Sequence, residues 1–452
     1  MLTRQVARRS PLVLRFGGQP RRLLSLLTPE EAGRQAEQLA QEVVLEKKEI
    51  SHMATSLAHA GVVTGKNAAM SPPLHMATTY TRPADGSYQE GDLIYTRMDN
   101  PTRNLLEAET GRLECHGRAV NSDTPIISCA FASGMMAVSS IVLAHRLPLK
   151  VLLPVDAYHG VPTVLRDVFS RFDVEIRTVE MSDPAAIEAD LAKISVKDDV
   201  IVWMESPSNP RVDIIDISLI SSIAEKSGRR VTTVVDSTLA PPTIQQPLQL
   251  GADLVMHSAT KYLGGHSDLL CGVVTASPWT NRGRFIGPLI RQVQVAVGGV
   301  ASPLDSWLTL RGLRTLAIRS SRQCETALLL VKYLQHHPLV DKVYYPGLEE
   351  HFGHKIAKRQ MKNGFGGVFS VEMIGESYAF AFAAALTVVQ RATSLGGTET
   401  LIEHRASIEP PGRVVSPRGL LRVSVGLEHA SDILSDFESA MDIVQTIHGI
   451  RG

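Results

Sequence analysis

Four short apolar runs alternate with helix-like segments in the middle of the chain, and this alternation constrains the fold most strongly. The runs are rich in β-branched residues and lie at 150–155, 200–205, 231–236 and 252–258. Because their apolar residues are continuous rather than alternating, they are typical of parallel strands buried on both faces. The segment 216–228 between two of them is helical in character, with Gly228 suited to its end. We therefore predict an α/β fold with a large, mainly parallel sheet.

A second, smaller α+β domain is predicted beyond a long helical stretch at 303–336. The segments 366–373 and 420–428 alternate apolar and polar residues, as antiparallel strands do. A chain of 452 residues also exceeds what one core usually organises. We expect a transit peptide at 1–30 and an N-terminal helix with an extended arm at 31–110. An α/β domain is expected at 111–310, and a linking helix with the C-terminal domain at 311–452.

The first thirty residues carry several arginines and no acidic residue before Glu30. Arginine-rich, acid-poor composition is typical of an organelle transit peptide, and no apolar core of a secretory signal follows. We expect import into mitochondria, with a plastid or the cytoplasm as the alternatives.

Charge and cysteine usage favour a small-molecule enzyme over other classes. Lys+Arg and Asp+Glu are both 46, and no basic tract follows the leader, so no nucleic-acid partner is expected. No apolar run reaches the length of about 18 residues that a membrane helix needs. The cysteines lack zinc spacing and predict packed thiols, a reducing compartment and no metal: Cys115, Cys129, Cys271 and Cys324.

Polar residues follow the predicted strands at the points where they end. Carboxyl ends of parallel strands meet at one edge of a sheet, where ligands of open α/β folds bind. Singly, each residue has an ordinary explanation, such as a surface lysine or a turn aspartate. Together, they predict one site made of Tyr158, His159, Glu205, Asn209, Asp236, Ser258, Thr260 and Lys261.

The chemistry of this set fits one cofactor. The carboxylate of Asp236, if buried, needs a partner, and a protonated ring nitrogen provides one. The amine of Lys261 can bond to a carbonyl. Hydroxyl groups and the N–H groups of a small-residue turn at 132–134, which opens a helix, can hold a phosphate. A pyridine nitrogen, an aldehyde and a phosphate together describe pyridoxal 5′-phosphate (PLP).

Seven segments also resemble the signatures of a known family. They are YTRMDNPTR, ASGMMA, ESPSNP, VVDSTLA, SATKYLGGHSD, SLGGTETLIEH and LLRVSVGLEH. In this order they are similar to the Cys/Met-metabolism, or trans-sulfuration, PLP enzymes, and the resemblance covers about 50–447. It implies PLP fold type I (aspartate-aminotransferase-like) and a homotetramer built from two active dimers.

The resemblance implies cofactor roles for particular residues. Lys261 matches the Schiff-base lysine, and Asp236 the carboxylate on the pyridine nitrogen. Tyr158 matches the tyrosine stacked on the ring, where we expect it to transfer protons with a pKa lowered by nearby cations. The phosphate contacts are matched by Gly134, Met135, Ser258, Thr260 and, from the arm of the neighbouring subunit, Tyr95 and Arg97.

Two further residues match contacts to the substrate, and Asn209 matches a contact to both the cofactor and the substrate. Arg422 matches the arginine that binds the substrate carboxylate, a task that suits a planar guanidinium. Ser394 matches a residue that orients Lys261 and the substrate, and Asn209 matches a contact near the ring oxygen of the cofactor.

The implied reaction acts on a sulfur amino acid or an activated homoserine. We expect γ-replacement or γ-elimination of the cystathionine γ-synthase or γ-lyase kind, with cystathionine β-lyase, methionine γ-lyase and homoserine sulfhydrylase as alternatives. Thr393 stands where these γ enzymes often carry an acid for the distal amine of cystathionine, and threonine cannot form that ion pair. His159 and Arg405 also depart from the family pattern.

A nicotinamide-dependent dehydrogenase is the remote alternative. It requires G-x-G-x-x-G between a strand and a helix, and the sequence has no such segment. The glycines at 61–67, in GVVTGKN, have the wrong spacing for a P-loop.

Overall fold

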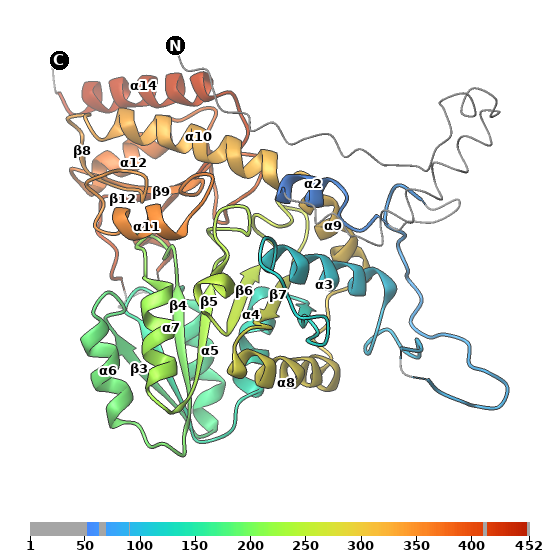
Figure 1. The fold of residues 1–452 in the computed structure, drawn as a ribbon. Coiled ribbons are helices and arrows are strands. Elements are labelled where there is room, and N and C mark those ends of the chain that lie inside the picture. Colours follow the sequence, from blue (N-terminus) through green and yellow to red (C-terminus); the bar gives the residue numbers. More distant parts are fainter. Residues whose placement is uncertain (1–51, 63–68, 90, 410–413, 450–452) are drawn as a thin grey trace, which may run out of the picture. The chain divides into compact units, whose positions relative to one another are not determined.

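Two β-sheets organise the described part of the chain (Figure 1). The computed structural model describes residues 52–62, 69–89, 91–409 and 414–449. The expected transit peptide at 1–30 and the helix expected after it lie outside the described residues and stay predictions.

The larger sheet has seven strands in the order β1-β7-β6-β5-β4-β2-β3. Neighbours from β6 to β3 are parallel, whereas β7 runs antiparallel to both β6 and β1. All four strands expected from the apolar runs are confirmed, as β2, β4, β5 and β6. The strands are β1 (Ser128–Phe131), β2 (Leu149–Pro154), β3 (Val174–Val179), β4 (Asp199–Glu205), β5 (Arg230–Asp236), β6 (Leu254–Ser258) and β7 (Gly272–Ala276).

Helices cover both faces of this sheet, which explains why its strands are apolar throughout. Along β2, Val151 and Leu153 pack into one buried cluster and Leu152 into another. The first cluster includes residues of α4 (Gly134–Leu143), α5 (Gly160–Asp167) and α8 (Asn281–Val297). The second includes residues of α6 (Pro184–Lys193) and α7 (Ile217–Lys226).

The ends of α7 show how local sequence sets a helix. The side chain of Asp216 accepts a hydrogen bond from the backbone N–H of Leu219 and satisfies one free donor of the first turn. Gly228, at a φ of +65°, ends the segment in the left-handed region that favours glycine. The helix expected at 216–228 is therefore confirmed. The 3₁₀ helices are η2 (Phe169–Arg171) and η3 (Pro247–Leu250).

The smaller sheet has the order β10-β11-β12-β9-β8 and is antiparallel except between β10 and β11. Its strands are β8 (Val340–Tyr344), β9 (Val368–Met373), β10 (Gln390–Arg391), β11 (Leu401–His404) and β12 (Leu420–Ser424). Both expected antiparallel strands are present, as β9 and β12. The helices in this region are α10 (Leu316–Leu334), α11 (His354–Gln360), α12 (Glu376–Ala385), α13 (Arg405–Ile408) and α14 (Ala430–Ile447). Residues of α10, α12 and α14 pack with β9 and β12 in one buried core.

The helical stretch expected at 303–336 is confirmed, but as two helices, because the chain forms α9 (Pro303–Leu313) and then α10. The carbonyl oxygen of Gly312 accepts hydrogen bonds from the hydroxyl of Thr315 and the guanidinium of Arg319. It also accepts the backbone N–H of Thr315, so the helical ladder ends there.

The segment expected at 31–110 as a helix and an extended arm contains α2 (Met53–Ala58) and the start of α3 (Pro101–Glu114). Between these helices the described residues form turns and irregular segments, with one isolated β-bridge between Thr79 and Tyr95. The domain limits expected at 110 and 310 fall within α3 and α9.

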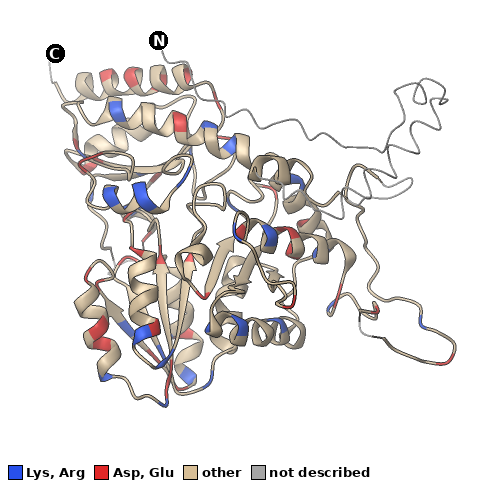
Figure 2. Cartoon of the chain, viewed as in Figure 1, with Lys and Arg blue, Asp and Glu red and all other residues tan. Residues whose placement is uncertain are grey.

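Charges of both signs occur in both regions but not on every helix. In Figure 2, α3 and α10 carry acidic and basic residues, whereas α8 and α11 carry only basic residues and α14 only acidic ones. All four cysteines are buried and free, which confirms the packed thiols. Within the described ranges, no helix combines the length and apolar character needed to cross a membrane.

Candidate active site

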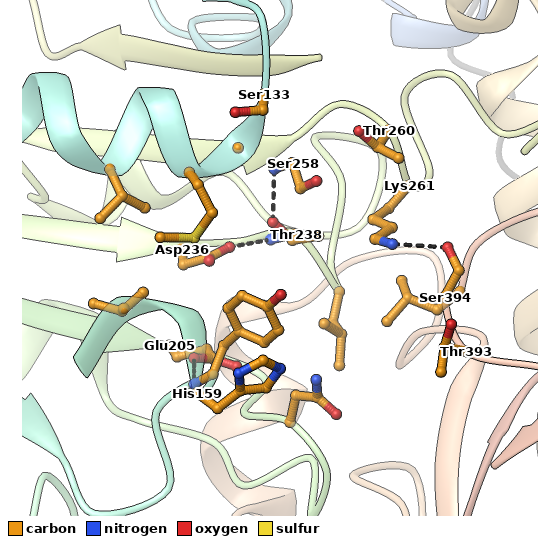
Figure 3. Close-up of a pocket in the computed structure, with 18 of the residues that line it drawn as sticks. Ser133, His159, Glu205, Asp236, Thr238, Ser258, Thr260, Lys261, Thr393 and Ser394 are labelled. Atoms are coloured by element: carbon orange, nitrogen blue, oxygen red, sulfur yellow. Dashed lines mark hydrogen bonds between the residues drawn. The ribbon is translucent and has the colours of Figure 1, made fainter. Parts of the chain in front are cut away.

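A cavity of about 480 Å³ opens beside the carboxyl ends of the larger sheet, and residues of both regions line it (Figure 3). Ten of the twelve residues with expected cofactor or substrate roles lie in its wall, and Tyr95 and Arg97 do not. The ten are Gly134, Met135, Tyr158, Asn209, Asp236, Ser258, Thr260, Lys261, Ser394 and Arg422. Glu205 and His159, also predicted at this edge, line the cavity as well.

The register of the parallel strands explains this convergence. Glu205 ends β4 and lies opposite Asp236, which ends β5; Asp236 in turn lies opposite Met256 of β6. Ser258 ends β6 two residues later. The strand ends therefore present their side chains and following turns to a single edge.

Lys261 lies in the turn after β6 with its amine in the cavity. Its Nζ donates a 2.7 Å hydrogen bond to Oγ of Ser394 (Figure 3). Burial, together with the positive charge of Arg422, lowers the pKa of Lys261 and favours the neutral amine, which is the nucleophilic form. Gly265, at a φ of +73°, keeps this turn tight, because a Cβ there would lie 2.0 Å from a guanidinium nitrogen of Arg319.

Asp236 is a buried carboxylate without an ion-pair partner among the described residues. It accepts a hydrogen bond from the backbone N–H of Thr238, whose hydroxyl accepts one from the N–H of Ser258. Burial raises the pKa of Asp236, and burial together with Asp236 raises the pKa of Glu205 further. Two adjacent buried carboxyl groups lie at this end of the cavity, and a cation bound beside them would stabilise their charged forms.

The N-terminus of α4 faces the same cavity. Ser133 caps the helix by accepting from the backbone N–H of Met136. The N–H groups of Gly134 and Met135 belong to the first turn, which has no intrahelical acceptors for them and attracts anions. A Cβ on Gly134 would lie 3.2 Å from Oγ of Ser258, so only a glycine leaves this space open.

Thr260 lines the cavity but uses its hydroxyl elsewhere. Its Oγ1 donates to the carbonyl of Cys271 at 3.2 Å and accepts from the N–H of Cys271 at 3.0 Å. This pair fixes the turn that carries Lys261, and the role of Thr260 toward a phosphate stays a prediction.

Tyr158 is positioned through its backbone, whose N–H donates to Glu205 at 2.7 Å. The expected lowering of its pKa is wrong for this chain. Burial, with the negative charges of Glu205 and Asp236, raises the pKa of Tyr158 and outweighs the lowering by Arg405 and Arg422.

Arg422 is held from three sides in the smaller sheet. It donates to Oδ1 of Asn209 at 3.1 Å, to the carbonyl of Ser394 at 2.8 Å and to Glu403 at 2.9 Å. Its Nε is buried and has no hydrogen-bond partner among the described residues. An unused, buried donor on a fixed guanidinium suits a carboxylate ligand.

The sequence-based site lacked Thr238 and Glu403. Thr238 follows a buried aspartate by two residues, a spacing at which aspartate commonly accepts from the backbone, and this signal was available. Glu403 is paired with Arg422 by the antiparallel register of β11 and β12, which the sequence does not specify.

Tyr95 and Arg97 belong to the extended arm, outside the cavity of their own chain. The backbone of Tyr95 bridges to Thr79, and its side chain is 46% exposed. Arg97 donates to the carbonyl of Val295, near the end of α8. Their contact with the site of a neighbouring subunit stays a prediction.

The residues present fit PLP. The unpaired Asp236 supplies the anion for a protonated ring nitrogen, the N-terminus of α4 suits a phosphate, and Lys261 supplies the amine for an aldehyde. The cavity volume lies in the range of small-molecule sites. Fold and cavity together define a PLP-dependent enzyme.

Comparisons with known proteins specify the family. The family model described as Cys/Met metabolism PLP-dependent enzyme matches residues 54–442. The chain belongs to this family, and PLP is its cofactor.

Relatives with different reactions are similarly close. The chain is 38% identical to a cystathionine gamma-lyase of Bacillus subtilis, over 86% of this chain and 98% of that protein. It is 37% identical to a cystathionine beta-lyase of Coxiella burnetii, with the same shares. A crystal structure of cystathionine gamma synthase from Xanthomonas oryzae, in complex with aminoacrylate and cysteine, is similar at a TM-score of 0.78 and 33% identity, covering 87% of this chain and 99% of that one.

Proposed function

We propose that this enzyme carries out replacement or elimination at the γ-carbon of an amino acid, of the cystathionine γ-synthase or γ-lyase kind. The observation that carries the proposal is the pairing of Lys261 with Ser394 beside Arg422, whose Nε is buried and unused. An α-amino acid bound through its carboxylate at Arg422 has its reacting carbons beside the amine of Lys261.

The residues of the chain have distinct tasks in this proposal. Bound PLP acts as an electron sink for the substrate carbanion. Arg422 orients the substrate through the substrate carboxylate. Neutral Lys261 removes a proton from Cα of the substrate and returns protons to the substrate carbons beyond Cα. Asp236 keeps the ring nitrogen protonated, and Tyr158 packs beside the reacting centre.

Similarity to relatives supports γ chemistry without excluding its alternative. The γ-lyase of B. subtilis and the γ-synthase of X. oryzae favour the γ-carbon, whereas the β-lyase of C. burnetii keeps a β-lyase reaction as the second candidate. Thr393 in the cavity wall offers a neutral hydroxyl. It supports substrates whose γ substituent carries no cationic amine, such as an acylated homoserine.

A substrate panel tests this function. Purified enzyme is incubated with PLP and, in separate reactions, with O-acyl-homoserine plus cysteine, cystathionine, methionine or cysteine, and Lys261→Ala serves as the inactive control. Cystathionine formation, or release of a four-carbon keto acid, supports γ chemistry. Formation of only homocysteine, pyruvate and ammonia from cystathionine, with no γ product from any substrate, would overturn it in favour of the β-lyase.

We also propose a homotetramer of two active dimers, in which Tyr95 and Arg97 reach the cofactor phosphate of the neighbouring subunit. Large apolar side chains exposed on the arm support burial in an assembly: Met70, Leu74, Met76, Tyr88 and Tyr95. Light scattering of the purified protein tests the assembly, and a monomer at micromolar concentration contradicts it.

For localisation, we propose mitochondrial import directed by residues 1–30. The arginine-rich, acid-poor composition of this segment supports the proposal. Fluorescent fusions of the full chain and of residues 31–452 test it, and import of both to the same extent contradicts it.

A further inference from the structure

Two arginines share one buried carboxylate in the wall of the cavity. Oε2 of Glu403 accepts from Arg422 at 2.9 Å, and Oε1 of Glu403 accepts from Nη1 of Arg405. The three side chains are exposed by only 4% to 7%. Arg405 begins α13 directly after β11, and its Nε has no partner among the described residues.

The charge of this cluster is unbalanced when the chain is alone. The two guanidinium groups and the carboxylate of Glu403 carry one net positive charge on side chains that are almost fully buried. The other charged residues of the cavity wall are Lys261 and the carboxyl pair Glu205 and Asp236 at the strand ends. Glu409, just after α13, is also close enough for the charge of Arg405 to help lower its pKa, but its carboxylate accepts hydrogen bonds from Val415 and Ser416. None of these side chains forms an ion pair with the cluster within the described residues.

A substrate carboxylate changes this balance in a way that depends on Arg405. If Arg422 and Glu403 were alone, they would form a neutral pair, and an incoming carboxylate would leave one negative charge uncompensated. With Arg405 present, two cations face two anions once the carboxylate is bound.

We propose that Arg405 balances the charge of Glu403 so that Arg422 can bind the α-carboxylate of the substrate. Arg405 is thus a positioning residue that acts through Glu403 rather than on the reacting atoms. The inference rests on the proposed role of Arg422 and goes beyond it, because it assigns the affinity for the carboxylate to a residue outside that contact.

Binding of two small ligands to the PLP-loaded enzyme tests the proposal. Glycine carries an α-carboxylate, and glycinamide carries an uncharged amide in its place. Affinities are measured by calorimetry or by the change in cofactor absorbance. Arg405→Met is expected to lower the affinity for glycine by about 10-fold or more, since a charge interaction in a buried site contributes on this scale. The affinity for glycinamide is expected to change by less than about 2-fold.

Changes at Glu403 separate charge balance from a merely structural role. Glu403→Gln is expected to bind glycine at least as tightly as the parent, because the remaining cluster is more positive. The double variant E403Q/R405M is expected to recover most of the glycine affinity that R405M loses. Arg405→Lys keeps the charge and retains glycine binding, which guards against a folding defect in R405M. Arg418→Met is the matched control, because Arg418 is 69% exposed and pairs with Glu376 outside the cavity.

Several results would overturn the proposal. R405M could bind glycine with unchanged affinity, or its affinities for glycine and glycinamide could fall equally. E403Q could also lose glycine binding without recovery in E403Q/R405M. If R405M lowers only the affinity for O-succinyl-homoserine, Arg405 binds the succinyl carboxylate of that ligand and the proposal is wrong. Arg422→Met distinguishes failure of the proposed role of Arg422 from failure of the inference about Arg405. If R422M still binds glycine more tightly than glycinamide, the role of Arg422 is wrong. If R422M loses this preference and R405M keeps it, only the inference about Arg405 is wrong.

Discussion

The amine of Lys261 donates a 2.7 Å hydrogen bond to the hydroxyl of Ser394, although 133 positions separate them in the chain. The carbonyl oxygen of Ser394 also accepts a hydrogen bond from Arg422. The backbone of Ser394 has a φ of +86°, a conformation that residues other than glycine rarely adopt. One residue of the smaller sheet region thus orients both the amine and the guanidinium of the cavity.

Two substitutions at Ser394 separate this hydrogen bond from the backbone conformation. Ser394→Ala and Ser394→Gly both remove the hydroxyl and are expected to lower kcat by about 10-fold or more, as loss of a hydrogen bond to a charged or basic group does. S394G is expected to be about 1 kcal/mol more stable than S394A, because glycine adopts positive φ without strain. Thermal unfolding of the apo proteins measures the difference, and equal stabilities contradict the account of the backbone.

The carboxyl pair at the strand ends predicts a pH dependence for the protein without PLP. Burial and Asp236 raise the pKa of Glu205, so the native state binds a proton that the unfolded state releases above about pH 4. The stability from protonated Glu205 is present below that pH and is lost as pH rises through the raised pKa.

Glu205→Gln keeps the shape of this side chain and removes its titration. The free energy of unfolding of apo E205Q is expected to fall less than that of the apo parent as pH rises from about 4 toward neutrality. Urea unfolding at several pH values measures both curves. Parallel curves would show that Glu205 does not carry the proton.

Gly134 predicts a selective effect on the phosphate of the cofactor. A methyl group at this position would meet Ser258 at 3.2 Å and fill the space in front of the first turn of α4. Gly134→Ala is expected to lower the affinity of the apo protein for PLP by about 10-fold or more. Its affinity for pyridoxal, which lacks the phosphate, is expected to change much less. Fluorescence titration of the apo protein compares the two ligands, and Ser258→Ala provides a second variant at the same place.

The arm predicts complementation between inactive variants. If Arg97 serves the site of a neighbouring subunit, Arg97→Ala and Lys261→Ala are each defective, but a mixed dimer contains one intact site. Random mixing after unfolding and refolding is expected to restore activity at about one quarter of the sites. Absence of recovery in dimers verified as mixed would place the function of Arg97 in its own chain.

The sequence predicted the larger sheet and its chemical edge because both follow from local patterns. Continuous apolar runs identify buried parallel strands, and the polar residues that end them must meet at one edge. Lys261, Asp236 and Ser258 could be found in this way. Ser394 and Arg422 could not, because they reach the cavity from the other sheet, and only the resemblance to a family indicated them.

The remaining differences depend on tertiary contacts. The break between α9 and α10 arises where Arg319 and Thr315 take the carbonyl of Gly312, a competition that no periodicity reports. The rise in the pKa of Tyr158 reflects burial beside two carboxyl groups, whereas sequence reasoning considered the cations alone.

We propose that Lys261 is the residue that bonds to PLP. Reduction of the PLP-loaded enzyme with borohydride, followed by digestion and mass spectrometry, locates the attachment most directly. A phosphopyridoxyl group is expected on the peptide that contains Lys261, and none is expected on that peptide in Lys261→Arg. A stoichiometric label on any other lysine, with the peptide of Lys261 unmodified, would contradict it.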